Sequence, residues 1–231
     1  MSTPPPPPPA KPPVRLVFTT GSPDETIALG IKLAAALRPG DTLLLEGDLG
    51  AGKTHFIRGL ARGLHLDESQ VCSPTFVLMN VYRAIGAPSL IHLDAYRLHG
   101  GDDLDAIGFD AATSRPSIVA IEWPSRLGER LAAFDPSRTI ALQLTHVGED
   151  LRLLTLDVPR AIVDRPALAP LVARSERPTG PTTCPITGQP VPPDSPTWPF
   201  ATEQARLADL HRWLTGGYAV SRDATPDDEE E

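Results

Sequence analysis

The chain has 231 residues, of which 27 are proline, and its 29 acidic and 21 basic side chains give a formal net charge of −8. No apolar run approaches the roughly 18 to 20 residues of a membrane-spanning helix, which excludes an integral helical membrane protein. Two cysteines, Cys72 and Cys184, and an N-terminus unlike a signal peptide exclude a secreted disulfide scaffold and predict a cytoplasmic protein.

Proline and charge are concentrated at the two ends of the chain. Residues 1–13 and 178–199 hold eight prolines each, whereas residues 14–175 carry a net charge of only −3 and residues 176–231 carry −6. A proline run forms an extended, unpaired segment, and a run of acids stays solvated. We therefore predict five regions: a disordered leader (1–13), a globular domain (14–175), a linker (176–183), a small second unit (184–220) and a disordered acidic tail (221–231).

The first elements of the domain alternate between helix and buried strand. The pair Ser22-Pro23 begins a helix with an apolar face, which ends before Pro39. The run Thr42–Glu46 is apolar at its central positions, as is typical of a strand buried on both faces. A helix over Lys53–Gly63 follows.

Five more strand-like runs follow, with a short helix at Leu104–Ile107 between the second and the third. The runs are Thr75–Tyr82, Leu90–Asp94, Ser117–Glu122, Thr139–Thr145 and Leu151–Val158. The last two alternate better between apolar and polar residues and lie close together, which favours an antiparallel edge. Buried strands alternating with helices predict an α/β three-layer sandwich with a mixed, largely parallel sheet.

Residues 47–54, with the sequence GDLGAGKT, match the phosphate-binding loop pattern GxxxxGK[ST] between a buried strand and a helix, the context that this motif requires. Glycines let backbone amides approach phosphate oxygens, and the helix N-terminus adds unpaired N–H groups. We expect Lys53 to reach the β- and γ-phosphates and the Thr54 hydroxyl to bind Mg²⁺. The sequence therefore predicts a P-loop NTPase whose nucleotide contacts are Gly47, Asp48, Leu49, Gly50, Ala51, Gly52, Lys53 and Thr54.

A magnesium ion at such a loop also needs a carboxylate at the end of a neighbouring strand. Asp94 ends one predicted strand and Glu122 ends the next. Either can hold the ion, directly or through water, and either can orient the attacking water. The residues alone do not rank the two acids, so the candidate catalytic residues are Lys53, Asp94 and Glu122.

Four motifs in register resemble the TsaE family, a small bacterial ATPase needed for threonylcarbamoyladenosine formation in tRNA. They are GDLGAGKT at 47–54, SPTF at 73–76, HLDAYRL at 92–98 and IEWPSRL at 121–127. The resemblance covers about Leu16 to Val158. It implies an ATPase, slow alone, that acts with two partners, TsaB and TsaD, of which TsaD modifies the tRNA. Because the domain lacks a basic stripe, we expect tRNA contact only through these partners.

The resemblance also implies roles for individual residues. Thr54 and Glu122 correspond to the magnesium ligands, Asp94 to the other functional acid, and Thr75 to a segment that resembles a nucleotide-sensing switch. Weaker matches place three more residues around the nucleotide: Glu25 and Thr26 near the base, and Arg152 in the final hairpin. ATP and Mg²⁺ are thus the expected ligands.

The C-terminal unit resembles a second family, YacG, a zinc-ribbon-like inhibitor of DNA gyrase. The similar segments are CPITGQPV at 184–191 and residues 198–214, which contain the one helix expected here, Glu203–Leu214. The four zinc cysteines of that family fall on Cys184, Thr187, Ala201 and Ala205. One thiolate cannot complete a tetrahedral zinc site, so we predict a degenerate module without zinc and without gyrase binding.

Two other functions compete with the ATPase. A small-molecule kinase would need an acceptor-binding lid, and the chain shows no Arg-rich insertion of that kind. A gyrase-binding module with a regulatory ATPase would need the zinc cysteines. We therefore predict a Mg²⁺-dependent ATPase of tRNA modification.

Overall fold

The structure is a computed structural model that describes residues 13–74, 77–98, 102–147 and 150–176, together with parts of 182–208. The predicted leader, most of the predicted linker, Thr75 and the acidic tail lie outside the described residues. No helix among the described residues is long and apolar enough to cross a membrane.

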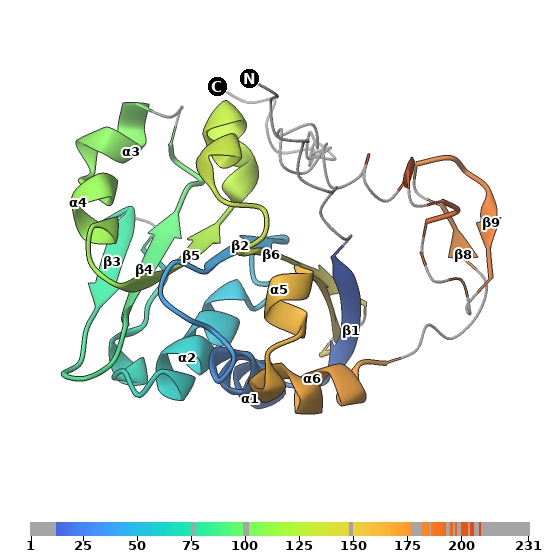
Figure 1. Cartoon of the computed structure of the whole chain (residues 1–231), viewed down its shortest axis with the longest axis horizontal. Helices are drawn as coiled ribbons and strands as arrows, with labels where there is room; N and C mark the ends of the chain where they lie inside the picture. The colour runs from blue at the N-terminus through green and yellow to red at the C-terminus, as the bar shows by residue number, and fades with distance from the viewer. Residues whose placement is uncertain are drawn as a thin grey trace, which may run out of the picture.

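Seven strands of the described chain form one mixed sheet in the order β1-β7-β6-β2-β5-β4-β3 (Figure 1). The four central strands, β6, β2, β5 and β4, are parallel to their neighbours within that group, while β3, β7 and β1 pair antiparallel. The strands are β1 (Val14–Thr20), β2 (Thr42–Glu46), β3 (Met79–Tyr82), β4 (Ser89–Asp94), β5 (Ser117–Glu122), β6 (Thr139–His146) and β7 (Arg152–Val158). The α/β fold with a mixed sheet is confirmed, and so is the antiparallel pairing of β6 with β7. Three of the six described strand pairings in this sheet are parallel, and the outer strand on the β7 side is β1, which the sequence analysis did not predict.

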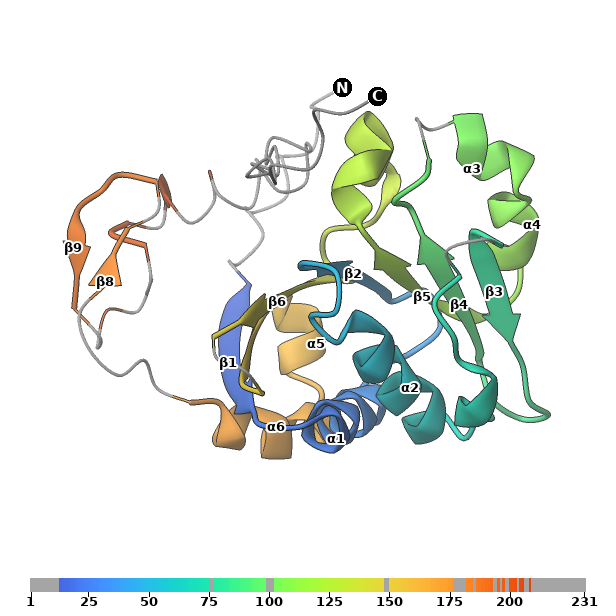
Figure 2. The same cartoon turned by 180° about the vertical axis from the view of Figure 1, so that it is seen from behind.

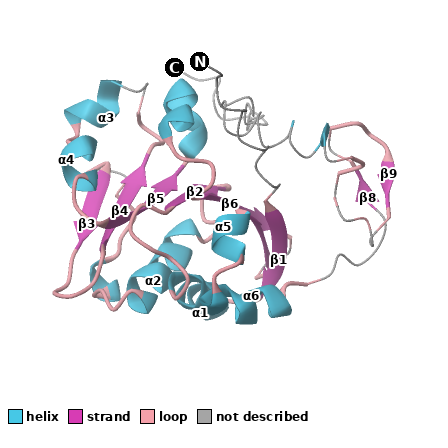
Figure 3. Ribbon diagram, in the orientation of Figure 1, coloured by secondary structure: helices cyan, strands magenta, loops and turns pink. Residues whose placement is uncertain are grey.

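Helices cover both faces of the sheet (Figures 2 and 3). One face carries α1 (Pro23–Ala34), α2 (Lys53–Gly63), α5 (Arg160–Val163) and α6 (Ala169–Arg174). The other carries α3 (Asp102–Ala106), α4 (Phe109–Thr113) and the 3-10 helix η2 (Pro124–Ala133). Two short 3-10 turns complete the described helical elements, η1 (Glu68–Gln70) and η3 (Pro166–Leu168). The result is the predicted three-layer sandwich.

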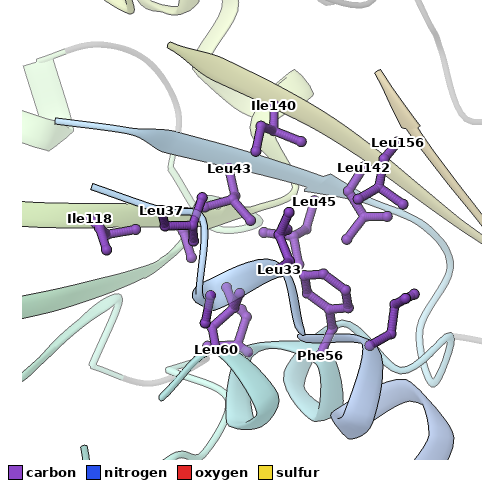
Figure 4. Close-up of a cluster of buried hydrophobic side chains, with 14 of the residues drawn as sticks. Leu33, Leu37, Leu43, Leu45, Phe56, Leu60, Ile118, Ile140, Leu142 and Leu156 are labelled. Carbon is purple, nitrogen blue, oxygen red and sulfur yellow. The ribbon is translucent and has the colours of Figure 1, made fainter. Parts of the chain in front are cut away.

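The period-two alternation of β2 divides the core between the two layers. Leu43 and Leu45 face α1 and α2, whereas Leu44 faces the opposite layer, and all three are fully buried. Figure 4 shows Phe56 from α2 close to the β2 leucines. Burying a side chain of this size contributes about 1.5–3 kcal/mol, which explains why the central positions of β2, Leu43, Leu44 and Leu45, are all apolar.

Helices α1 and α2 touch through their backbones. A Cβ atom on Gly30 would lie 2.4 Å from the carbonyl oxygen of Phe56, and one on Gly59 would lie 2.2 Å from that of Ile27. Neither position has room for a larger residue. The helix that begins at Lys53 is therefore in direct backbone contact with α1.

The structure corrects the start of one strand and adds elements that the sequence did not predict. Strand β3 begins at Met79 and not at Thr75, because Leu78 has a left-handed backbone (φ 66°) and its amide donates to the Pro74 carbonyl. The sequence analysis also missed β1, α5 and α6. The region after Val158 therefore contributes helices to the sandwich.

The last two residues of the predicted linker and the start of the C-terminal unit form a small hairpin, β8 (Thr182–Thr183) with β9 (Pro190–Val191), beside an apolar cluster. That cluster consists of Cys184, Val191, Phe200 and Ala205. The guanidinium carbon of Arg15 on β1 lies 4.7 Å from the centre of the Phe200 ring. Most of the expected helix Glu203–Leu214 lies outside the described residues.

Candidate functional site

The turn between β2 and α2 contains the predicted phosphate-binding loop, residues 47–52. Gly47 has a left-handed φ of 148°, and a Cβ atom there would lie 2.4 Å from the carbonyl oxygen of Leu144 on β6. Gly52, immediately before α2, has φ 104°. Both conformations favour glycine. Because the first amides of an α-helix have no partner within it, the start of α2 is a ready anion site.

Lys53 bends back over this loop and is almost completely buried. Its Nζ atom donates to the carbonyl oxygens of Gly47 at 2.5 Å and Asp48 at 3.1 Å. Burial lowers the pKa of Lys53 below its ordinary value, and the negative charge of Glu122 opposes that shift. The ammonium group is therefore held by the carbonyl oxygens of the loop.

Thr54 and Glu122 are in direct contact. Glu122 is the last residue of β5, and its side chain points to the α2 side because Ala120, two residues earlier, faces that layer. The Thr54 hydroxyl donates to Oε1 of Glu122 at 3.1 Å. The same oxygen is 2.9 Å from Nε2 of His92 on β4. Glu122 is 3% exposed and His92 is 0% exposed, so the carboxylate is enclosed by protein.

Asp94 ends β4 and lies opposite Glu122 in the register of the two parallel strands. Its Oδ1 accepts a hydrogen bond of 3.0 Å from the amide of Tyr96. Burial raises the pKa of Asp94 above its ordinary value, and the charge of Glu122 adds to this rise. The two acids that the sequence could not rank therefore differ in their surroundings, since Glu122 contacts the loop threonine and Asp94 caps a backbone amide.

Two residues that the sequence analysis did not place in the site also contact it. The ring of Trp123 lies over Lys53. Glu46, at the end of β2, accepts a 3.4 Å hydrogen bond from the amide of Ser125, and burial raises its pKa. The position of Trp123 directly after Glu122 and that of Glu46 directly before Gly47 were the available signals.

Two of the remaining predicted residues, Thr26 and Glu25, lie in different surroundings. Thr26 lies beside the loop, since a Cβ atom on Gly52 would be 3.9 Å from its methyl carbon, and its hydroxyl is 2.9 Å from that of Thr20. Glu25 instead accepts a 2.7 Å hydrogen bond from the Gly21 amide and helps to begin α1. The structure does not describe Thr75.

Two further predicted residues lie around the start of α2. Arg152 opens β7. The pKa of His55 on α2 is lowered first by burial and then by the positive charges of Arg58 and Arg152. Leu49 in the loop is 91% exposed.

A loop that holds a lysine over its own carbonyls, between a buried parallel strand and a helix that faces two strand-end carboxylates, defines the chain as a P-loop NTPase. The family model described as threonylcarbamoyl adenosine biosynthesis protein TsaE matches residues 20–153. The chain therefore belongs to the TsaE family, as the four motifs predicted.

Similar proteins agree with this assignment. The chain is 39% identical over 140 residues to a tRNA threonylcarbamoyladenosine biosynthesis protein TsaE of Mycobacterium leprae, covering 57% of this chain and 84% of that protein. It is 36% identical over 141 residues to the protein of that name in Bacillus subtilis, covering 61% and 84%. The match to the Streptomyces coelicolor protein of that name is 46% identical over 97 residues and covers 41% of this chain but only 64% of the relative.

A solved structure also resembles this fold. The crystal structure of Bacillus subtilis YdiB is similar with a TM-score of 0.50 and 29% sequence identity, over 69% of this chain and 95% of that one. The similarity thus covers almost the whole of YdiB.

Proposed function

We propose that this chain is a Mg²⁺-dependent ATPase that acts with TsaB and TsaD in the formation of threonylcarbamoyladenosine in tRNA. The observation that carries the ATPase is the contact of Thr54 with Glu122 beside the buried Lys53. The similar proteins are all named as tRNA threonylcarbamoyladenosine biosynthesis proteins, which supports a role in this pathway. TsaB and TsaD are the partners that the motif resemblance implied.

The residues present fit a magnesium ion. Hydroxyl and carboxylate oxygens are the protein ligands that Mg²⁺ prefers, and Thr54 and Glu122 offer one of each at 3.1 Å from one another. When bound, the ion would neutralise charge on the phosphates. In this proposal Thr54 and Glu122 hold it, directly or through water.

Lys53, the amides at the start of α2 and Asp94 have the other parts in binding and hydrolysis. Lys53 exchanges the carbonyls of Gly47 and Asp48 for the β- and γ-phosphates, and the amides at the start of α2 bind phosphate oxygens. Asp94 orients the attacking water and accepts its proton. Its raised pKa suits a general base, because the ideal catalytic pKa lies near the operating pH.

Nucleotide titration tests the loop assignment. Lys53→Ala is expected to abolish binding of a fluorescent ATP analogue, because it removes the ammonium group that the loop holds over its carbonyls. Lys32→Ala, which changes the lysine in the last turn of α1, is the matched control and should bind like the wild type. Unchanged affinity in Lys53→Ala would refute the phosphate-loop assignment.

Complementation tests the pathway. A cell depleted of its own TsaE should recover threonylcarbamoyladenosine in tRNA, measured on digested tRNA, when it expresses this chain. We expect recovery also without residues 176–231, since the proposed ATPase residues all precede them, and no recovery with Lys53→Ala. An unmodified tRNA pool in cells that express the folded wild-type chain would refute the role in tRNA modification but not nucleotide binding.

A further inference from the structure

His92 is a buried histidine in contact with Glu122, one of the two proposed magnesium ligands. It lies in β4 two residues before Asp94, so both side chains point to the α2 side of the sheet. Its exposed fraction is 0%, and its Nε2 atom is 2.9 Å from Oε1 of Glu122. A residue in this position cannot touch a nucleotide in the loop except through Glu122.

The chemistry of His92 and Glu122 determines which of them donates the hydrogen bond between them. An ionised carboxylate only accepts hydrogen bonds, so Nε2 of His92 carries the hydrogen and donates it to Glu122. The hydroxyl of Thr54 donates to the same Oε1 atom. Two donors from two different elements, β4 and α2, therefore hold one oxygen of Glu122 and limit the rotation of its side chain.

The other ring nitrogen shows that an imidazole at this place is not simply a packing residue. Nδ1 of His92 has no hydrogen-bond partner among the described residues, although it is buried. Its neighbour is the ring of Tyr82, with the two ring centres 6.4 Å apart. Leaving a buried polar atom unpaired is unfavourable, and an apolar residue of similar shape would avoid that cost. The contact of Nε2 with Glu122 is the interaction that an imidazole provides here and an apolar residue does not.

We propose that His92 is a positioning residue that holds the carboxylate of Glu122 against Thr54, so that both oxygens are in place for Mg²⁺. This inference rests on the proposed function. It assigns His92 to the magnesium-dependent part of nucleotide binding and not to the phosphate contacts of the loop. Groups that orient metal ligands in this way commonly change metal affinity 10- to 100-fold when they are removed.

The test compares nucleotide affinity with and without magnesium. A fluorescent ATP analogue is titrated into each folded protein in excess EDTA and again in excess Mg²⁺, and the ratio of the two dissociation constants gives the gain from magnesium. His92→Leu should reduce this gain by about tenfold or more and leave the affinity in EDTA within about twofold of the wild type. His92→Gln should keep most of the gain, because its amide can still donate to Glu122. Tyr82→Phe, which changes the neighbouring ring but not the donor, should behave like the wild type.

A double-mutant cycle separates positioning from a general loss of packing. In a Glu122→Gln background, His92→Leu should have no further effect on the magnesium gain, because the group it positions is already changed. A full magnesium gain in His92→Leu, or an equal loss in His92→Gln and His92→Leu, would overturn the role of His92 alone. If His92→Leu does not fold, retention of the gain in His92→Gln supports the role and its loss refutes it. A wild type that binds nucleotide without any magnesium gain would overturn the proposed function and this inference together.

Discussion

The Nζ atom of Lys53 lies 4.0 Å from the centre of the Trp123 ring. Trp123 has a left-handed backbone, with φ 57° and ψ 45°, which is uncommon for a bulky residue and costs on the order of 1–3 kcal/mol. Its amide donates to the carbonyl of Leu45 at 3.1 Å, and its ring centre is 5.3 Å from that of Tyr96. The unfavourable backbone of Trp123 thus coincides with a position of its indole ring over Lys53.

We expect Trp123→Leu to strengthen nucleotide binding. A cation over an aromatic ring gains about 0.5–2 kcal/mol, and Lys53 must leave the Trp123 ring to reach a phosphate, so the contact stabilises only the nucleotide-free protein. The dissociation constant in EDTA should therefore fall about two- to thirtyfold. Phe134→Leu, which changes a ring that packs on Phe109 in the opposite layer, is the control. Weaker binding in Trp123→Leu would instead show that the ring contacts the nucleotide.

Glu122→Ala and Asp94→Asn should separate metal binding from water activation. Glu122→Ala is expected to raise the Mg²⁺ concentration for half-maximal hydrolysis by about tenfold or more, because it removes a proposed ligand. Asp94→Asn should lower the rate constant by about 10²–10⁴-fold at an unchanged magnesium requirement. Steady-state hydrolysis across a magnesium series gives both values. The assignment fails if Glu122→Ala requires no more magnesium than the wild type, or if Asp94→Asn requires as much as Glu122→Ala.

Glu46→Gln should stabilise the protein at neutral pH. Burial raises the pKa of Glu46 above its ordinary 4.5, so the folded protein binds this proton more tightly than the unfolded chain does. The free energy of unfolding therefore falls as the pH rises from about 4.5 through the raised pKa. Glutamine avoids the charge and still accepts from the Ser125 amide. In urea titrations the variant should exceed the wild type at pH 8, with the difference vanishing at pH 4. A difference that grows towards low pH contradicts this reasoning.

The fully buried Asp41 should make Arg165 important for stability. Its two oxygens accept hydrogen bonds from Arg165, and Oδ1 also accepts from Nη2 of Arg138 at 2.9 Å. The Arg165 side chain is 9% exposed, whereas that of Arg138 is 38% exposed. Removing the buried partner leaves a buried charge poorly compensated, so Arg165→Ala should cost about 3–5 kcal/mol of unfolding free energy, measured in urea. Arg138→Ala, the control, should cost about 1 kcal/mol or less. Equal losses in the two variants would refute this ranking.

The C-terminal unit is expected to contain no zinc when the protein is purified and analysed for metals. Its one described cysteine, Cys184, is buried in the apolar cluster, and a single thiolate cannot form a structural zinc site. The backbone amide of Thr187 lies 3.4 Å from the Cys184 sulfur, and Ala201 and Ala205 pack in or against the same cluster. Substituting cysteine at these three positions should therefore create a site for one zinc ion. One equivalent of zinc in the wild type would contradict the prediction.

The central strands and the nucleotide loop could be predicted because their signals are local. The strands β2, β4 and β5 are five or six residues long and mostly apolar at their central positions, and residues 47–54 carry the whole loop pattern. The ends of the sheet were harder. Strand β1 pairs with β7 more than 130 residues later, and no short-range pattern reports such a pairing.

The site was predictable in its residue types but not in its contacts. The sequence places Asp94 and Glu122 at strand ends, but it does not show that Glu122 reaches Thr54 while Asp94 caps an amide. That difference depends on the side-by-side register of two parallel strands and on the position of α2. The position of Trp123 over Lys53 could not be predicted, because the left-handed backbone that turns its ring toward Lys53 has no signature in the residues around it.

The glycine contact between α1 and α2 limits where this protein can change shape. With Gly30 against the Phe56 carbonyl and Gly59 against that of Ile27, α2 cannot slide or tilt without pushing backbone into backbone. The N-terminus of α2, with Lys53 and Thr54, is therefore fixed relative to α1. We expect nucleotide binding to rearrange the side chains around the loop, such as the Trp123 ring over Lys53, and to leave the packing of α1 on α2 unchanged.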